Sequence, residues 1–398
     1  MEIKLTKDSL TRAGVIILLL SGLVFHDFFV LPGVKLGVIT ITYLRVALAV
    51  CLPLLMFFYK VRISKNDVLA YILIIFMLYG LFRIEGNLKE AFGLYCPLIA
   101  FFILYCTIDD ERIIKKCVDV LSVFYIFFCL VGIYELITQH HLVETHFDYS
   151  DVTEHVACGM YYNENDFSAF LSVMMIYMLL SSFNRLVKLF FVLLGFIIIC
   201  LNKSVVCILG LILFALIAFV IRKRTNFFFR LMLFFILVVI LINPLTVIVN
   251  SSSIYWRKYM YAFGLKNVIE HMWFGVGIGN YADGMISVGY KPMEHTSADP
   301  HNLFFEIGAC FGIVWAILFI FLLIKLLTWN LKRAANVQNL ICFGLIILIP
   351  FIGFASSSCL EKNYIYIALL LPALCYRFNC KRNVVNRSLL VKLETGVT

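Results

Sequence analysis

The chain has 398 residues, of which 63% are hydrophobic and only 14% charged, and it carries a net charge of +9. About a quarter of the residues in soluble domains are charged, so this composition excludes an ordinary soluble globular protein. The positive charge does not indicate nucleic acid as a partner, because the basic residues are spread over short segments where contact with anionic membrane lipid is the simpler interpretation.

Twelve apolar runs are long enough to cross the hydrocarbon core of a bilayer as helices. In chain order they cover residues 14–31, 37–59, 68–83, 91–108, 117–137, 166–184, 186–201, 205–221, 231–249, 303–327, 340–355 and 363–377. The first run follows basic residues as a secretory signal does, but no small-residue cleavage site comes after it, so we expect it to remain as the first helix. We therefore predict an all-α polytopic membrane protein of about twelve transmembrane helices, forming a single membrane domain over residues 1–398.

The distribution of Lys and Arg predicts the orientation of these helices, because cytoplasmic segments hold the excess of basic residues. If the N-terminus is cytoplasmic, the segments on that side contain most of the Lys and Arg, whereas all eight histidines lie on the outer side. The even number of runs and the basic tail place the C-terminus in the cytoplasm as well.

The first long outer loop covers residues 139–165 and is rich in histidines and acidic residues. Its histidines lack the spacing of a metal-binding helix, so we expect neither a metal nor another cofactor. The loop ends in "NEND" directly before the next apolar run, where Asn165 or Asp166 is expected to accept the free N–H groups of the helix start.

The second long outer loop covers residues 250–302. Aromatic residues between Tyr255 and Phe263 recur at helical spacing and predict an amphipathic helix along the membrane surface, with its aromatic rings toward lipid. Arg257 and Lys258 on this helix are either solvated or lipid-bound cations, or they form a phosphate site in which the Arg257 guanidinium makes a bidentate contact.

A glycine-rich stretch, "FGVGIGNYADG", follows this helix and includes Gly277 and Gly279. The glycines predict a tight turn with positive φ angles that leads the chain back to the outer mouth of the protein. Such a turn is also able to present backbone N–H groups to an anion, and the sequence alone does not separate the two roles.

Two further cations stand out within or between the apolar runs. Arg45 lies inside the second run, where a charge is either functional or paired with a buried carboxylate such as Glu135 or Glu306. Lys203 lies in the short outer turn "LNKSVV", where it either contacts a ligand or simply extends its amine to the interface.

The stretch "ADPHNLFFEIGACFGIVW" joins the second outer loop to the tenth apolar run and places Asp299, His301 and Asn302 at the junction. A neutral imidazole there is able to act as a general base, and the alternative is an interfacial helix cap formed with Asn302. Because the chain has no GxxxxGK[ST] motif, chemistry at this face requires a substrate that is already activated, such as a sugar linked to a lipid pyrophosphate.

These motifs, in the order "NEND", "NKS", an aromatic helix with Arg, "GVGIGN" and "PHN", resemble those of the O-antigen polymerase and O-antigen ligase superfamily. The similarity is sharpest between residues 157 and 316. It implies a bacterial inner-membrane glycosyltransferase with periplasmic loops, acting by inverting, metal-independent transfer from an undecaprenyl-pyrophosphate-linked oligosaccharide. By position, the resemblance assigns the essential loop arginine to Arg257 and the acceptor-assisting histidine to His301.

The resemblance further implies that Lys203, Arg45 and Lys258 assist Arg257 at the pyrophosphate, with Asn302, Asp299, Asn165, Gly277 and Gly279 as supporting residues. The ligase motif fits His301, Asn302 and Gly312 but departs at Trp315, which favours a polymerase. An O-antigen ligase remains the alternative, a lipid-linked oligosaccharide transporter is the alternative of another class, and a chain-length regulator is a possible protein partner.

Overall fold

The computed structural model describes most of the chain. The described residues are 7–25, 35–36, 39–40, 42–58, 67–84, 88–143, 145, 155–221, 252–291, 300–355 and 358–378. The predicted run 231–249 and Asp299 lie outside them. β structure in the described residues consists of two short strands, β1 (Lys35–Leu36) and β2 (Ile39–Thr40), which pair antiparallel, and one isolated parallel bridge between Ile84 and Ile278.

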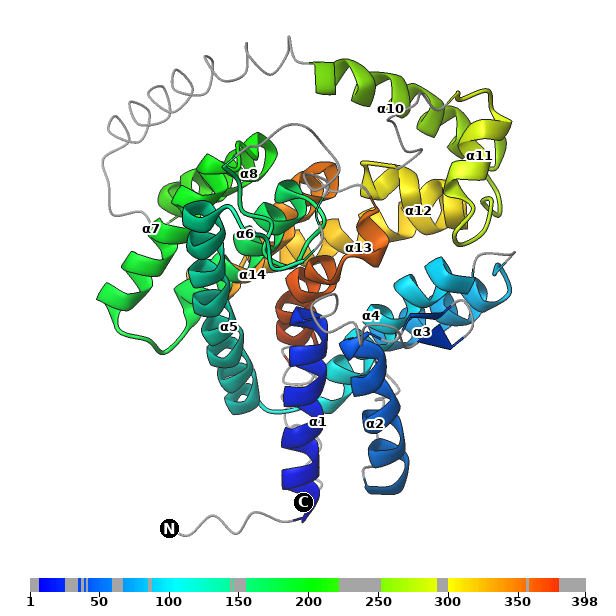
Figure 1. Cartoon of the computed structure of the whole chain (residues 1–398). Coiled ribbons are helices and arrows are strands. Elements are labelled where there is room, and N and C mark those ends of the chain that lie inside the picture. The colour runs from blue at the N-terminus through cyan, green and yellow to red at the C-terminus, as the bar shows by residue number, and fades with distance from the viewer. Residues whose placement is uncertain are drawn as a thin grey trace.

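Helices form over every predicted apolar run that the structure describes, as continuous apolar sequence without breakers favours. In chain order they are α1 (Lys7–Val24), α2 (Tyr43–Phe58), α3 (Val68–Leu81), α4 (Leu88–Thr107), α5 (Glu111–Thr138), α6 (Glu164–Leu180), α7 (Arg185–Leu201), α8 (Val205–Ile221), α12 (Leu303–Phe311), α13 (Ile313–Leu331), α14 (Val337–Ala355) and the last helix, Asn363–Phe378 (Figure 1). By length and composition α4, α5, α13 and α14 are able to cross a membrane. The fold is thus all-α and compatible with a membrane protein.

The helix starts are fixed by short polar side chains that accept backbone N–H groups. Those with such a contact are Asp67 for α3, Asp110 for α5, Asn163 for α6, Asn184 for α7 and Asn302 for α12. The prediction for α6 was wrong in detail. Asn163 is the cap and accepts from the Asp166 N–H at 2.8 Å, because the helix begins at Glu164 and takes both predicted residues into its first turn.

The core of the bundle is α6, which is buried from Asp166 to Met178 and packs against α5, α7 and α14. Helices at the periphery instead expose large apolar side chains. On α7 these are Leu186, Leu189, Phe190, Leu193 and Ile197, and on α13 they are Val314, Ile317, Phe321 and Ile324. An apolar exterior around a packed core is the arrangement that contact with lipid requires.

The predicted run 303–327 is not one continuous helix. It breaks at Gly312, which has a φ of 92° and separates α12 from α13. A Cβ atom at this position would lie 2.4 Å from the Trp273 carbonyl oxygen, and the next residue, Ile313, donates its N–H to the Met272 carbonyl at 2.7 Å. The break therefore results from the close approach of the chain around Met272, which a periodicity argument does not detect.

Polar contacts define two ends of the bundle. At one, the Arg377 end, the Arg377 guanidinium forms an ion pair with Asp67 at 3.0 Å, and the Arg12 side chain donates to the Thr107 carbonyl at 2.9 Å. The beginning of α1 and the end of the last helix therefore both lie at this end. At the opposite end, named here the His301 end, helix α10 (Ser252–Glu270), helix α11 (Tyr281–Ser287) and the short turn η2 (Cys359–Glu361) connect the longer helices (Figure 1).

Candidate functional site

Arg257 and His301, the two residues that the sequence places at the centre of the site, meet around Tyr261. Arg257 lies on α10 and donates from Nη1 to the Phe354 carbonyl, at the end of α14, at 3.1 Å. One turn further along α10, the Tyr261 hydroxyl donates to the His301 carbonyl at 2.9 Å. Tyr261 therefore connects the backbone of His301 to the part of α10 that carries Arg257.

Tyr261 is a residue that the sequence did not single out. Burial raises the pKa of its hydroxyl, and the Arg257 charge opposes part of that rise. A phenol with a raised pKa stays protonated and remains a hydrogen-bond donor at neutral pH. The centre of its ring lies 5.8 Å from that of Phe305 and 6.2 Å from that of Phe354. Tyr261 therefore faces protein, whereas the aromatic pattern of α10 predicted contact with lipid.

His301 occupies an unusual backbone conformation immediately before α12. Its φ is 41°, in the left-handed region that few residues other than glycine adopt, although histidine tolerates it better than most. Asn302 follows as the helix cap, and its side-chain oxygen accepts from the Phe304 and Phe305 N–H groups at 2.9 and 3.2 Å. Asn302 thus forms the helix cap at this junction, and the strain at His301 is of a kind that clusters at functional sites.

A buried ion pair lies at the start of α6. The carboxylate of Asp166 is fully buried and lies 3.0 Å from the Lys362 ammonium, whose side chain is 20% exposed. The same carboxylate accepts from the Tyr364 hydroxyl at 2.9 Å and from the Asn163 amide at 3.1 Å. Lys362 was missed in the sequence because a single lysine in a short segment between two apolar runs carries no spacing motif.

A second buried carboxylate organises the turn that precedes Lys362. Glu306, in the first turn of α12, accepts the N–H groups of Cys359 and Leu360 at 2.8 and 3.1 Å. This side chain therefore links the helix that follows His301 to the turn that presents Lys362.

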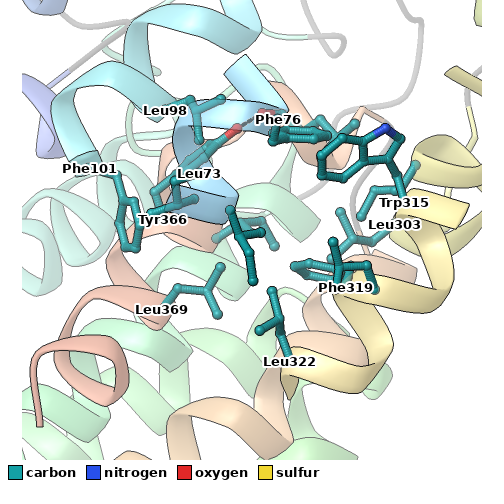
Figure 2. A pocket seen from close by; sticks show the side chains of 15 residues that line it. Leu73, Phe76, Leu98, Phe101, Leu303, Trp315, Phe319, Leu322, Tyr366 and Leu369 are labelled. Atoms are coloured by element: carbon teal, nitrogen blue, oxygen red, sulfur yellow. Dashed lines mark hydrogen bonds between the residues drawn. The ribbon is translucent and has the colours of Figure 1, made fainter. Parts of the chain in front are cut away.

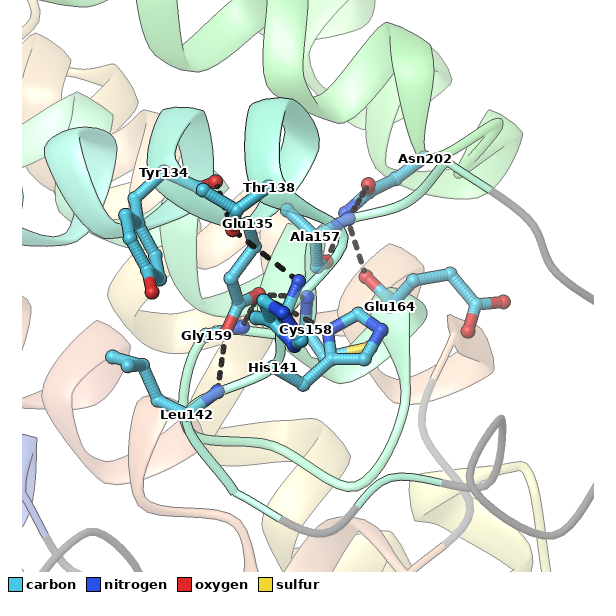
Figure 3. Close-up of polar contacts among 11 residues, drawn as sticks. Tyr134, Glu135, Thr138, His141, Leu142, Ala157, Cys158, Gly159, Glu164 and Asn202 are labelled. Atoms are coloured by element: carbon cyan, nitrogen blue, oxygen red, sulfur yellow. Dashed lines mark hydrogen bonds and ion pairs between the residues drawn. The ribbon is translucent and has the colours of Figure 1, made fainter.

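Lys203 lies at the same end of the bundle, in the turn between α7 and α8, with a φ of 54° and an exposed side chain. Its neighbour Asn202 is buried and joins three segments (Figure 3). The Asn202 side chain exchanges two hydrogen bonds with the Ala157 backbone, at 2.9 and 2.8 Å, and donates to the Ser168 hydroxyl at 3.1 Å. Asn202 thereby fixes the turn that carries Lys203.

Glu135, at the end of α5, holds the first long loop in place (Figure 3). Its fully buried carboxylate accepts the N–H groups of Cys158 and Gly159, both at 2.7 Å, and of Leu142 at 3.1 Å. The His141 Nδ1 atom lies 3.5 Å from it. A carboxylate with several backbone donors needs no arginine to compensate its burial.

Arg45 lies on α2 and contacts α4. Its guanidinium is 5.9 Å from the centre of the Phe92 ring and lies within hydrogen-bonding range of the Cys96 side chain. The proposed pairing with Glu135 is wrong, since that carboxylate is held by backbone N–H groups and His141.

The glycine turn has the positive φ angles that its sequence predicts: 70° at Gly275, 91° at Gly277 and 81° at Gly279. Its N–H groups are used within the fold. Those of Val276 and Gly277 donate to carbonyls in the last turn of α12, at 2.7 and 3.1 Å. These contacts favour the role of Gly277 in a tight turn over a role in binding an anion. The turn packs against the break between α12 and α13.

Two other predicted site residues that the structure describes, Lys258 and Asn165, have different surroundings. Lys258 is exposed on α10. The Asn165 amide donates to the neighbouring Glu164 carboxylate at 2.9 Å. Within the described part of the chain, no group of three or more His, Cys, Asp or Glu side chains has an arrangement suited to a metal ion.

An apolar cavity lies between α3, α4, α12, α13 and the last helix (Figure 2). Its volume is about 100 Å³. Its lining residues include Leu73, Phe76, Phe101, Trp315 and Leu369. Leu303 and Leu360 also line it, so the cavity extends to the start of α12 and to the turn that precedes Lys362. A cavity of this lining suits part of a hydrocarbon chain, and Leu303 and Leu360 place one side of it at the His301 end.

No protein-family model matches the sequence, and no curated protein matches it either. The chemistry of the site is therefore read from its own residues. They combine a strained histidine, a guanidinium, an exposed lysine and a lysine paired with a buried carboxylate, a set suited to binding phosphate and accepting a proton.

Proposed function

We propose that the protein is an O-antigen polymerase, which joins undecaprenyl-pyrophosphate-linked oligosaccharide repeat units into a polysaccharide. The observation that carries this proposal is the meeting of Arg257 and His301 around Tyr261, although long stretches of chain separate them. The motif resemblance assigns those same two positions to the donor pyrophosphate and the acceptor hydroxyl.

The proposed topology has twelve transmembrane helices in the bacterial inner membrane, with both termini in the cytoplasm. In it the Arg377 end faces the cytoplasm and the His301 end faces the periplasm, because the predicted cytoplasmic segments hold most of the basic residues. Arg12 contacts Thr107, and Arg377 contacts Asp67. These contacts support the proposed topology, because each joins two segments that were both assigned to the cytoplasmic side.

In the proposed reaction a hydroxyl of the next lipid-linked repeat unit attacks the anomeric carbon of the growing chain. The bond from that carbon to the pyrophosphate oxygen breaks with inversion, and undecaprenyl pyrophosphate leaves. Arg257 stabilises the negative charge that develops on the leaving group, Lys203 adds a second cation, and His301 accepts the proton of the attacking hydroxyl. The apolar cavity lined by Phe76 and Trp315 suits part of the polyprenyl chain.

Trp315 is the residue at which the chain departs from the ligase motif. Its ring packs against Phe76 at 4.9 Å and Tyr79 at 5.5 Å, so this position contributes to the wall of the cavity. An O-antigen ligase, which would transfer finished polymer to lipid A core, is the alternative that the test below separates from a polymerase.

Deletion of the gene, with lipopolysaccharide analysed on a gel, tests the proposal. We expect lipid A core that carries a single repeat unit, and complementation with Arg257→Ala or His301→Ala should not restore the ladder although the protein is present in the membrane. Bare core with polymer left on its lipid carrier would indicate a ligase instead. An unchanged ladder in the deletion strain would reject both and favour a transporter or another function.

A further inference from the structure

The ion pair between Asp166 and Lys362 is a buried, charged feature that the proposed reaction has not yet used. We propose that Lys362 is a further binding residue for the pyrophosphate of the lipid-linked donor, and that Asp166 is the positioning residue that holds its ammonium group at the site. This inference rests on the proposed function, since it names another contact to the same substrate.

The exposure of the pair favours a binding role for the lysine. Asp166 is fully buried, whereas the Lys362 side chain is 20% exposed, so its ammonium lies at the boundary between the core and the His301 end. An ammonium has three donors, and Asp166 accepts one of them at 3.0 Å. Because the Lys362 side chain is partly exposed, a phosphate oxygen that approached it would add to the Asp166 contact and would not have to replace it.

Hydrogen bonds to neighbouring carbonyls link the Arg257 side chain to the turn before Lys362. Arg257 donates to the Phe354 carbonyl at 3.1 Å, and the Cys359 thiol donates to the carbonyl of the adjacent residue, Gly353, at 3.1 Å. Cys359 begins the turn that leads to Lys362. The guanidinium and this turn therefore contact consecutive residues at the end of α14, although they come from distant parts of the chain.

The surrounding contacts restrict the position of the ammonium. Tyr364 and Asn163 both donate to Asp166, and Glu306 holds the N–H groups of the turn before Lys362. A lysine that is fixed in this way loses less conformational entropy on binding than a lysine with a mobile chain. A lipid pyrophosphate carries more than one negative charge, so a single guanidinium does not balance it.

Binding of undecaprenyl pyrophosphate to the full-length protein in lipid nanodiscs tests the inference. Lys362→Met combined with Asp166→Asn removes both charges and leaves neither buried alone. We expect this double variant to bind about tenfold more weakly than the wild type, because a charge-assisted contact is lost, while Lys362→Arg stays near the wild type. Lys188→Met is the matched control, because the Lys188 ammonium also bonds within the fold, to the Ser181 carbonyl at the opposite end of α6.

A second measurement does not depend on the folding of any variant. In the wild type, undecaprenyl pyrophosphate should protect Lys362, and not Lys188, from an amine-acetylating reagent, as read by mass spectrometry. Equal labelling of Lys362 with and without the lipid, or unchanged binding by a folded double variant, would overturn the inference. A normal ladder in the deletion strain would instead reject the polymerase and leave the measured role of Lys362 in pyrophosphate binding standing.

Discussion

The hydrogen bond from Tyr261 to the His301 carbonyl gives the most direct test of how the site is held together. Tyr261→Phe removes one hydroxyl and keeps the ring that packs against Phe305 and Phe354. If this bond keeps His301 in its left-handed conformation, the variant should retain the fold and lose much of its polymerase activity.

The expected magnitude follows from the lost contact. A single hydrogen bond contributes about 1 kcal/mol to stability, and a carbonyl left without its donor costs about 1 to 3 kcal/mol. A left-handed conformation at a residue other than glycine costs about 1 to 2 kcal/mol, so the hydrogen bond and this strain are similar in size. Without this bond, the fraction of molecules in which His301 is correctly placed should fall by about tenfold. The rate of polymer synthesis should fall by the same factor.

Tyr177→Phe is the matched control for this experiment. The Tyr177 hydroxyl also donates to a backbone carbonyl, that of Ile367, at 2.6 Å in the buried core of the bundle. Both variants should lower the thermal stability of the purified protein, and only Tyr261→Phe should reduce polymer synthesis from purified lipid-linked repeat units. Equal rates for the two variants would refute the argument that Tyr261 positions His301.

Three further predictions concern the fold and the guanidinium. Gly275→Ala should lower the melting temperature strongly, because the new Cβ atom would lie 2.4 Å from the Cys310 carbonyl. Gly14→Ala, with nothing within 4 Å of the new Cβ atom, should not lower it, since alanine within a helix is at least as stable as glycine. Arg377→Met should lower the free energy of unfolding of the purified protein by about 3 to 5 kcal/mol, because it leaves the Asp67 carboxylate buried without its ion pair. Adding Asp67→Asn to the same chain should recover part of that loss. An Arg377→Met variant as stable as the wild type would contradict this account. Arg257→Lys should still give much less long polysaccharide on a lipopolysaccharide gel, because an ammonium lacks the planar fork of a guanidinium, and a full ladder would show that charge alone is sufficient.

The helical character of the protein and the approximate place of its helices could be predicted from the sequence, because apolar runs of this length have few other stable structures. The positive φ angles at Gly277 and Gly279 were predicted for the same kind of local reason. The helix cap at α6 was misplaced by two residues or more, because "NEND" offers several side chains with nearly the same capping chemistry.

What the sequence determined by itself was local: which segments are apolar, where the chain turns, and that Arg257 and His301 are unusual in their surroundings. Only the tertiary structure decided which distant residues meet. The contact of Tyr261 with His301, the pair of Asp166 with Lys362 and the break at Gly312 each depend on segments far apart in the chain. The physical reason is that a buried charge or carbonyl is stabilised by whichever donor the packing brings to it, and no local pattern in the sequence records that donor.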